Sequence, residues 1–164
     1  MPALQPGKTA PEISLPDVQG RRFSWQQTLN RGPLALVFFK ISCPVCQYAL
    51  PFVERLYRAH KGKVSVVGVS QNPKPDTEAF LRQYDISFPV LLDDTTAYPV
   101  SNAYGLTNVP TTFLISTGGE IEVSSVGWSR QGLEEINRRV SKAVAAPPAA
   151  LFLHGEEVPD FTAG

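Results

Sequence analysis

The sequence lacks an excess of either charge. Fifteen lysine and arginine residues balance fifteen aspartate and glutamate residues, so the formal net charge of the 164 residues is zero. Proteins that bind nucleic acids or anionic membrane surfaces present strongly basic patches. The balance therefore predicts that neither nucleic acid nor a membrane is among the partners of this protein.

Long apolar runs are also missing. No stretch approaches the roughly 18 apolar residues that cross a bilayer. The first ten residues, MPALQPGKTA, lack the apolar core of a secretory signal. As given, the sequence predicts a soluble, cytoplasmic protein, and an extracytoplasmic location stays open if a leader has been trimmed.

Cysteine and histidine are scarce, with two residues of each. A zinc site normally needs four ligands, and His60 and His154 do not stand at metal-ligand spacing. A domain of this size buries about 70% of the surface that its unfolded chain exposes, so its core needs no metal or disulfide. We expect one domain without a metal or cofactor.

Apolar residues follow the pattern of a buried sheet with helices packed on it. The continuous apolar run Leu34–Phe39 has the length of a strand that is buried on both faces, and Val64–Val69 (VSVVGV) repeats the pattern of a buried strand. Between them, apolar residues recur at helical spacing from Val45 to Tyr57. A helix between two such strands indicates a right-handed βαβ unit, so the predicted class is α/β with a central sheet flanked by helices.

Shorter signals predict the elements around this unit. They are a β-hairpin over residues 13–23, a helix from Trp25 to Asn30 with Ser24 and Gln27 as a capping box, a helix from Asp76 to Tyr84, a strand over Phe88–Leu92, a helical turn over Pro99–Tyr104, a hairpin of Thr112–Ser116 and Ile121–Val126, and a helix from Ser129 to Val144. Residues 1–144 then form the domain. Residues 145–164 form a tail that either packs on the domain or is disordered, and the sequence suggests no function for it.

Both cysteines lie in one motif, Cys43-Pro44-Val45-Cys46, between the first buried strand and the long helix. Two thiols three positions apart at the start of a helix come within disulfide distance. Free backbone N–H groups and the helix dipole favour the thiolate of the first thiol. Cys43 is therefore the predicted nucleophile, and Cys46 is the more buried thiol that resolves a mixed disulfide.

Two further features accompany the motif. Lys40 stands three residues before Cys43, where it either stabilises a thiolate or is a solvated corner residue. The sequence Val109-Pro110-Thr111 directly precedes a predicted strand, where a proline ordinarily marks a strand edge.

Together these residues resemble the thioredoxin-fold redoxins, a group that includes the AhpC/TSA and the TlpA/ResA-like branches. The resemblance runs from Ala10 to about Val144. It rests on the segment APEISLPDVQG, the strand leading to CPVC, Pro51 five residues after Cys46, and the segment GLTNVPTTFLI. It implies a thioredoxin-like fold, a mixed sheet with an N-terminal β-hairpin and a central helix–strand insertion.

The resemblance also implies roles for single residues. Pro110 is expected to be a cis-proline that faces the cysteine pair. The backbone of Val109, and of Thr111 beside it, is expected to form a docking strip for a substrate chain. Pro51 is expected to kink the helix. The other residues expected to support the active site are Lys40, Ser42, Pro44 and Val45.

Several positions depart from the redoxin patterns. Thioredoxins carry a tryptophan before the first cysteine and a buried aspartate six residues before it, where this sequence has Ser42 and Val37. The ResA-like branch has a glutamate three residues after the second cysteine, where this sequence has Ala49. No proton acceptor for Cys46 is therefore identified.

The peroxidase pattern Pro-x-x-x-Thr-x-x-Cys fits poorly too. Counted from Cys43, Leu36 and Lys40 take the proline and threonine positions. Counted from Cys46, Phe39 and Cys43 take them. Neither register supplies the hydroxyl that orients a peroxide.

The predicted function is thiol–disulfide exchange in redox homeostasis, with a protein disulfide or dithiol as substrate and an unidentified thiol reductant or oxidant as partner. One alternative is a thiol-dependent peroxidase. A second is a thioredoxin-fold copper-delivery chaperone, although those proteins use CxxxC spacing and a distal histidine, which are missing here.

Overall fold

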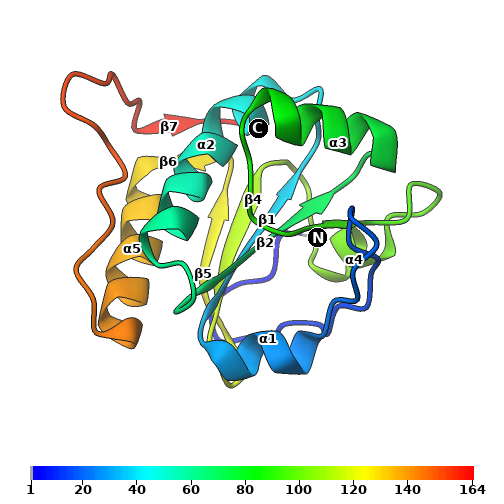
Figure 1. The fold of residues 1–164 in the computed structure, drawn as a ribbon, viewed down its shortest axis with the longest axis horizontal. Helices are drawn as coiled ribbons and strands as arrows, with labels where there is room; N and C mark the ends of the chain where they lie inside the picture. Colours follow the sequence, from blue (N-terminus) through cyan, green and yellow to red (C-terminus); the bar gives the residue numbers. More distant parts are fainter. Residues whose placement is uncertain (1) are drawn as a thin grey trace.

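The apolar run Leu34–Phe39 forms β1, the middle strand of the central sheet (Figure 1). The structure is a computed structural model that describes residues 2–164. All six residues of β1 are buried, because the strand pairs on both edges and is covered on both faces. The five strands lie in the order β3-β2-β1-β4-β5. Their bounds are β1 Leu34–Phe39, β2 Ser65–Ser70, β3 Val90–Leu92, β4 Thr111–Ile115 and β5 Ile121–Val126.

The sheet is mixed, as the sequence predicts. β1 runs parallel to β2, and β2 runs parallel to β3. β4 and β5 are antiparallel to their neighbours and form the expected hairpin. The parallel pair needs a crossover, which places the start of the helix that follows β1 at the carboxyl edge of the sheet.

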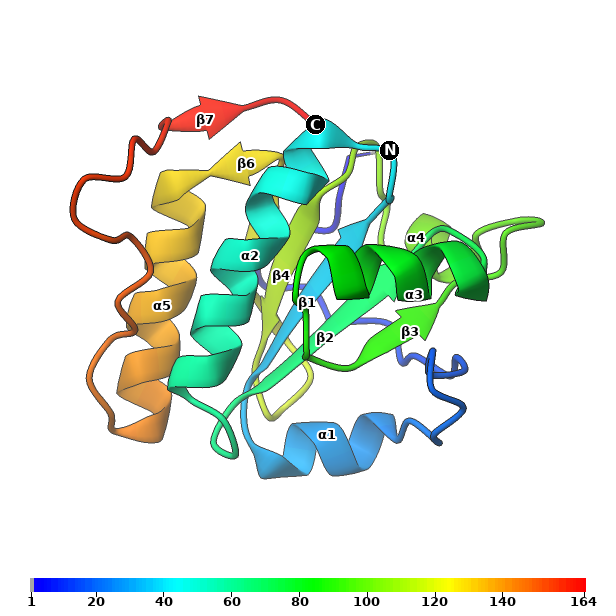
Figure 2. The same cartoon turned by 45° about the horizontal axis from the view of Figure 1, so that its top comes forward.

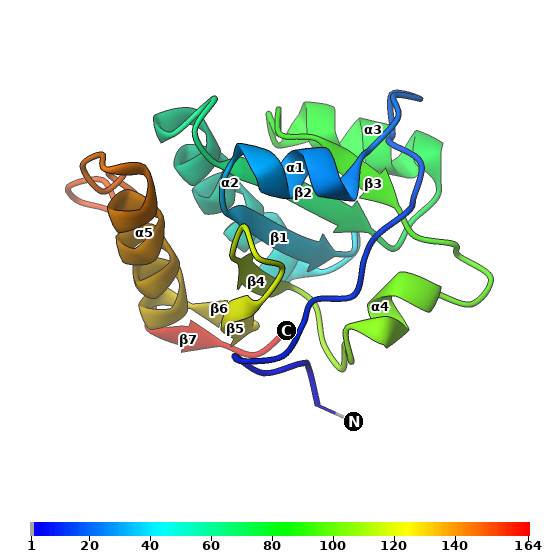
Figure 3. The same ribbon diagram turned by 90° about the horizontal axis from the view of Figure 1, so that it is seen from below.

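Helices cover both faces of the sheet. Figure 2 shows α2, α3 and α5 on one face, and Figure 3 shows α4 on the opposite side. Figure 2 also shows α1 running across one end of the sheet. Side chains of β1 alternate accordingly, with Val37 and Phe39 packing among residues of α2 and Leu36 and Phe38 packing on the opposite side. The helices are α1 Trp25–Arg31, α2 Pro44–Ala59, α3 Lys74–Gln83, α4 Pro99–Ala103 and α5 Arg130–Val144.

The predicted N-terminal hairpin is reduced to a single antiparallel bridge between Pro16 and Arg22. Pro16 has no N–H to donate. Backbone groups of the segment bond to β3 instead, with the N–H of Val18 donating to Val90 and the carbonyl of Pro16 accepting from Leu92. Apart from that bridge, the segment lies along the edge of the sheet beside β3.

Two elements, α3 and β3, begin at other residues than the sequence predicts. The helix expected to begin at Asp76 begins at Lys74, because the first turn of a helix accommodates proline, and Pro75 lies in that turn. Asp76 lies in the first turn, where its charge faces the positive end of the helix dipole. The strand expected from Phe88 begins at Val90, after a proline that lacks an N–H.

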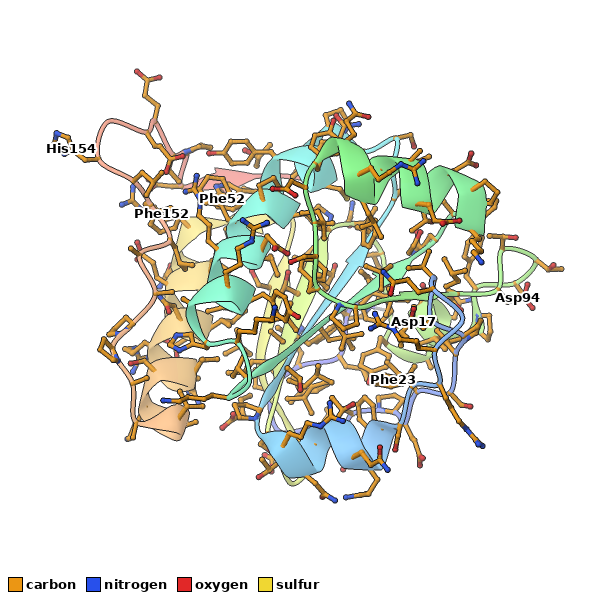
Figure 4. All side chains as sticks on the ribbon, viewed as in Figure 1. Asp17, Phe23, Phe52, Asp94, Phe152 and His154 are labelled. Carbon is orange, nitrogen blue, oxygen red and sulfur yellow. The ribbon has the colours of Figure 1, made fainter. Side chains whose placement is uncertain are left out.

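Residues 145–164 pack along the outer side of α5 and return to the first turn of α2 (Figures 1 and 2). Leu151 is buried in the core, and Phe152 packs against Phe52, as Figure 4 shows. Two short strands, β6 (Trp128–Ser129) and β7 (Phe161–Thr162), then pair antiparallel.

Among residues 2–164 there is no helix with the length and apolar character needed to cross a bilayer.

Candidate active site

Cys43 is the N-cap residue of α2, immediately after β1 and its corner. Its backbone is extended, and its Sγ accepts a hydrogen bond from the backbone N–H of Cys46 at 3.2 Å. Pro44 occupies the first turn, where its missing N–H leaves no hydrogen bond unmade. The sulfur of Cys43 therefore sits at the positive end of the helix dipole, where a thiolate is stabilised.

The two thiols lie in different environments. Both are free, but Cys43 is half-buried and Cys46 is fully buried. Burial raises the pKa of the Cys46 thiol, and the neighbouring Cys43 side chain raises it further. Val37 and Ala49, which replace the acidic residues of related patterns, belong to the same apolar core as Cys46. Cys46 is therefore held as a neutral thiol while Cys43 faces the solvent.

Val109 and Pro110, the segment expected to dock a substrate chain, lie directly opposite Cys43. The Sγ of Cys43 donates to the carbonyl oxygen of Val109 at 3.5 Å, although 66 positions separate the two residues in the sequence. The Val109–Pro110 peptide bond is cis. Val109 is half-buried, whereas Pro110 is buried. The structure thus brings Cys43, Cys46, Val109 and Pro110 together.

Thr111 is placed differently. It is fully buried in β4, paired with Phe38 on one side and Val126 on the other. Its hydroxyl donates to the carbonyl of Asn108 at 2.8 Å. Thr111 thus shapes the loop that carries Val109 and offers no side chain to a substrate.

The expected supporting residues surround the pair in different ways. Lys40, Ser42 and Pro44 are exposed around Cys43. Val45 is half-buried in the first turn of α2, and Pro51 lies inside the helix. Burial raises the pKa of the Cys46 thiol, and the positive charge of Lys40 lowers it by a smaller amount.

Sequence reasoning missed two residues that hold the corner before Cys43. The side chain of Asn72 accepts from the backbone N–H of Ile41 at 2.9 Å. Gln47 donates to the carbonyl of the same residue, also at 2.9 Å. Asn72 is the second residue after β2, and the carboxyl ends of parallel strands meet at one edge of a sheet, so its position carried a usable signal.

Comparison with known proteins identifies the group. The family model of the AhpC/TSA family matches residues 6–124 of this chain. The chain belongs to the AhpC/TSA family.

The sequence is also similar to proteins named thiol-disulfide oxidoreductase ResA. The protein of Halalkalibacterium halodurans is 33% identical over 132 residues, covering 79% of this chain and 73% of that protein. That of Geobacillus thermodenitrificans is 32% identical over 122 residues, covering 73% and 68%.

Solved structures agree on the fold of this AhpC/TSA member. A putative protein disulfide isomerase from Bacteroides thetaiotaomicron superposes with a TM-score of 0.79 at 18% identity, covering 88% of this chain and 95% of that one. A putative thiol:disulfide interchange protein DsbE from Chlorobium tepidum gives 0.75 at 24% identity, covering 87% and 99%. The thioredoxin-like fold, the named relatives and the juxtaposed cysteines identify this family member as a thiol–disulfide oxidoreductase.

Proposed function

We propose that this oxidoreductase acts on disulfides of protein chains that lie along Val109–Pro110, with Cys43 as the attacking thiol and Cys46 as the resolving thiol. The observation that carries the proposal is the position of the Cys43 Sγ. It is at once the N-cap of α2 and within 3.5 Å of the Val109 carbonyl oxygen.

The proposed exchange has two steps. The thiolate of Cys43 attacks one sulfur of the substrate disulfide, forming a mixed disulfide, and the other substrate sulfur leaves as a thiolate that takes up a proton. Cys46 then loses its proton and attacks the Cys43 sulfur. The Cys43–Cys46 disulfide forms, and the substrate departs as a dithiol. The reverse sequence oxidises a substrate, so the direction depends on which dithiol or disulfide recycles the pair.

Differences between the two thiols support this assignment of roles. The first thiol must be accessible and stabilised as a thiolate, which fits the half-buried N-cap Cys43. The second must remain protonated until the mixed disulfide has formed, which fits the burial that raises the pKa of Cys46.

Position 109 supports a chain-like substrate. The carbonyl oxygen of Val109 is a backbone acceptor beside the reactive sulfur, and the following residue has no N–H with which to pair. An extended polypeptide can hydrogen-bond to such a backbone while its disulfide reaches Cys43, as in recognition by strand addition. The exposed Lys40, Ser42 and Pro44 would flank the approaching chain.

The structure offers little support for peroxide chemistry. Leu36, at the proline position of the peroxidase pattern, is fully buried on the face of the sheet opposite α2. Lys40, at the threonine position, carries no hydroxyl.

Reduction of insulin disulfides with dithiothreitol as donor tests the proposed function. We expect catalysed turnover by the wild type, because both cysteines are placed for exchange, and background rates for Cys43→Ser. Hydrogen peroxide consumption in the same buffer should stay near background. Peroxide turnover that matches or exceeds insulin reduction would favour the peroxidase alternative instead.

The cytoplasmic location stays a prediction, which cell fractionation with an antibody to this protein would test.

A further inference from the structure

The last residue of the given sequence, Gly164, lies against the docking strip. Gly164 packs so closely against Val109 that a Cβ atom at position 164 would collide with the Val109 carbonyl oxygen. That oxygen is the group to which the Cys43 Sγ donates. The backbone oxygen of Gly164 accepts from the side chain of Asn108 at 3.1 Å. Gly164 thus occupies the surface beside the reactive sulfur.

The segment that ends at Gly164 contains a short strand. Thr162 pairs with Trp128 and Phe161 pairs with Ser129, in the antiparallel ladder of β6 and β7. Just before it, the carbonyl of Asp160 accepts from the N–H of Arg130 at 2.9 Å. Figure 2 shows this segment reaching the first turn of α2. β6 therefore extends the docking strip into a longer edge for strand addition.

Gly127 provides the room for this approach. It links β5 to β6 with a φ of +75°, and its N–H donates to the carbonyl of Pro110 at 2.7 Å. A Cβ at this position would lie 2.7 Å from the carbonyl oxygen of Thr162 and 3.3 Å from the nitrogen of Gly164. Because Gly127 has no side chain, a second backbone can lie close to the chain at this point.

We infer that residues 161–164 occupy the binding surface of the substrate chain, and that a protein substrate binds by displacing them and pairing with β6 in their place. This inference rests on the proposed docking of substrate along Val109–Pro110. The partner that fits the surface is an extended, uncharged polypeptide segment with a small residue opposite Val109, as in the sequence Phe-Thr-Ala-Gly that lies there.

Displacement can remain local because the preceding part of the tail is firmly held. Leu151 is buried, and Arg55 makes two hydrogen bonds to the carboxylate of Glu156, at 2.7 and 2.8 Å. Arg55 lowers the pKa of Glu156 to about 2, so this carboxylate is ionised at neutral pH. β7 has only two residues, both exposed, and such short exposed pairings open at low cost.

Removal of residues 161–164 tests the inference in insulin reduction. If the strip is free in about a tenth of the unshortened molecules, kcat/KM should rise about tenfold in the shortened protein. A synthetic peptide with the sequence PDFTAG should then inhibit the shortened protein competitively, and a scrambled peptide should not. His154→Ala serves as the matched control, since His154 points away from the molecule at the outer turn of the tail (Figure 4). Its kcat/KM should equal that of the wild type.

A substitution that keeps all 164 residues controls for misfolding of the shortened protein. Thr162→Pro keeps the length of the chain and removes an N–H from the β7 strand, so it should raise kcat/KM in the same direction. Equal, measurable rates in wild type and both tail variants would overturn the inference alone. A lower rate in both variants would also overturn it, because the tail would then assist binding. Background rates in all proteins would refute the proposed function, and the inference with it.

Discussion

Cys46→Ser is expected to convert the protein into a covalent trap for its substrate. Cys43 remains at the N-cap of α2 beside the Val109 carbonyl, so attack on a disulfide still starts. A serine hydroxyl in the buried position of Cys46 cannot attack the Cys43 sulfur, so the mixed disulfide persists. Turnover should fall to background, and non-reducing gels with intact-mass measurement should show a stoichiometric adduct with an insulin chain.

Cys43→Ser is the matched control for this trap. The remaining thiol is fully buried, and burial raises its pKa, so it offers neither access nor a thiolate. We expect no adduct. Trapping of similar amounts by both variants would contradict the assignment of an attacking and a resolving thiol.

Alkylation of the reduced native protein should modify Cys43 far ahead of Cys46. Cys46 has no exposed surface, so it reacts only when the start of α2 opens. An opening free energy of about 3 kcal/mol slows the reaction about a hundredfold. Burial raises the pKa of Cys46, so its alkylation should stay slow at pH 8 to 9, about where ordinary thiols become thiolates.

Peptide mass mapping after timed additions of iodoacetamide measures both rates. Denaturation in urea is the internal control, since it should bring the two cysteines to similar reactivity. Faster labelling of Cys46 than of Cys43 in the native protein would reverse the two roles.

The regular part of the fold could be predicted from the sequence because its signals are local and periodic. The run Leu34–Phe39 became β1 without a change of boundary, and the cap of α5 is Ser129 as expected. Errors arose where tertiary partners outweighed local pattern. The segment around Pro16 resembles a hairpin in isolation, but β3 competes successfully for its backbone groups.

The residues of the site also fall into those with a local sequence signal and those placed by distant contacts. Cys43 and Cys46 could be predicted because four consecutive residues give both their spacing and their place at the start of a helix. The hydrogen bond of Asn72 with Ile41 spans 31 positions, and that of Asn108 with Gly164 spans 56, so neither could be predicted from neighbouring residues. The position of Asn72 after a parallel strand was the one available signal. The tail showed no sustained period, and its place beside the strip follows from packing on Trp128 and Phe52.

A redox titration of the Cys43–Cys46 pair tests the central claim most directly. The protein is equilibrated in a series of thiol–disulfide buffers, quenched with acid, denatured, alkylated and weighed. We expect two alkyl groups in reducing buffers and none in oxidising ones, joined by a single two-electron transition in which about 30 mV changes the ratio tenfold. Two alkyl groups in every buffer, or oxidation only to intermolecular disulfides, would show that the pair is not a working redox couple.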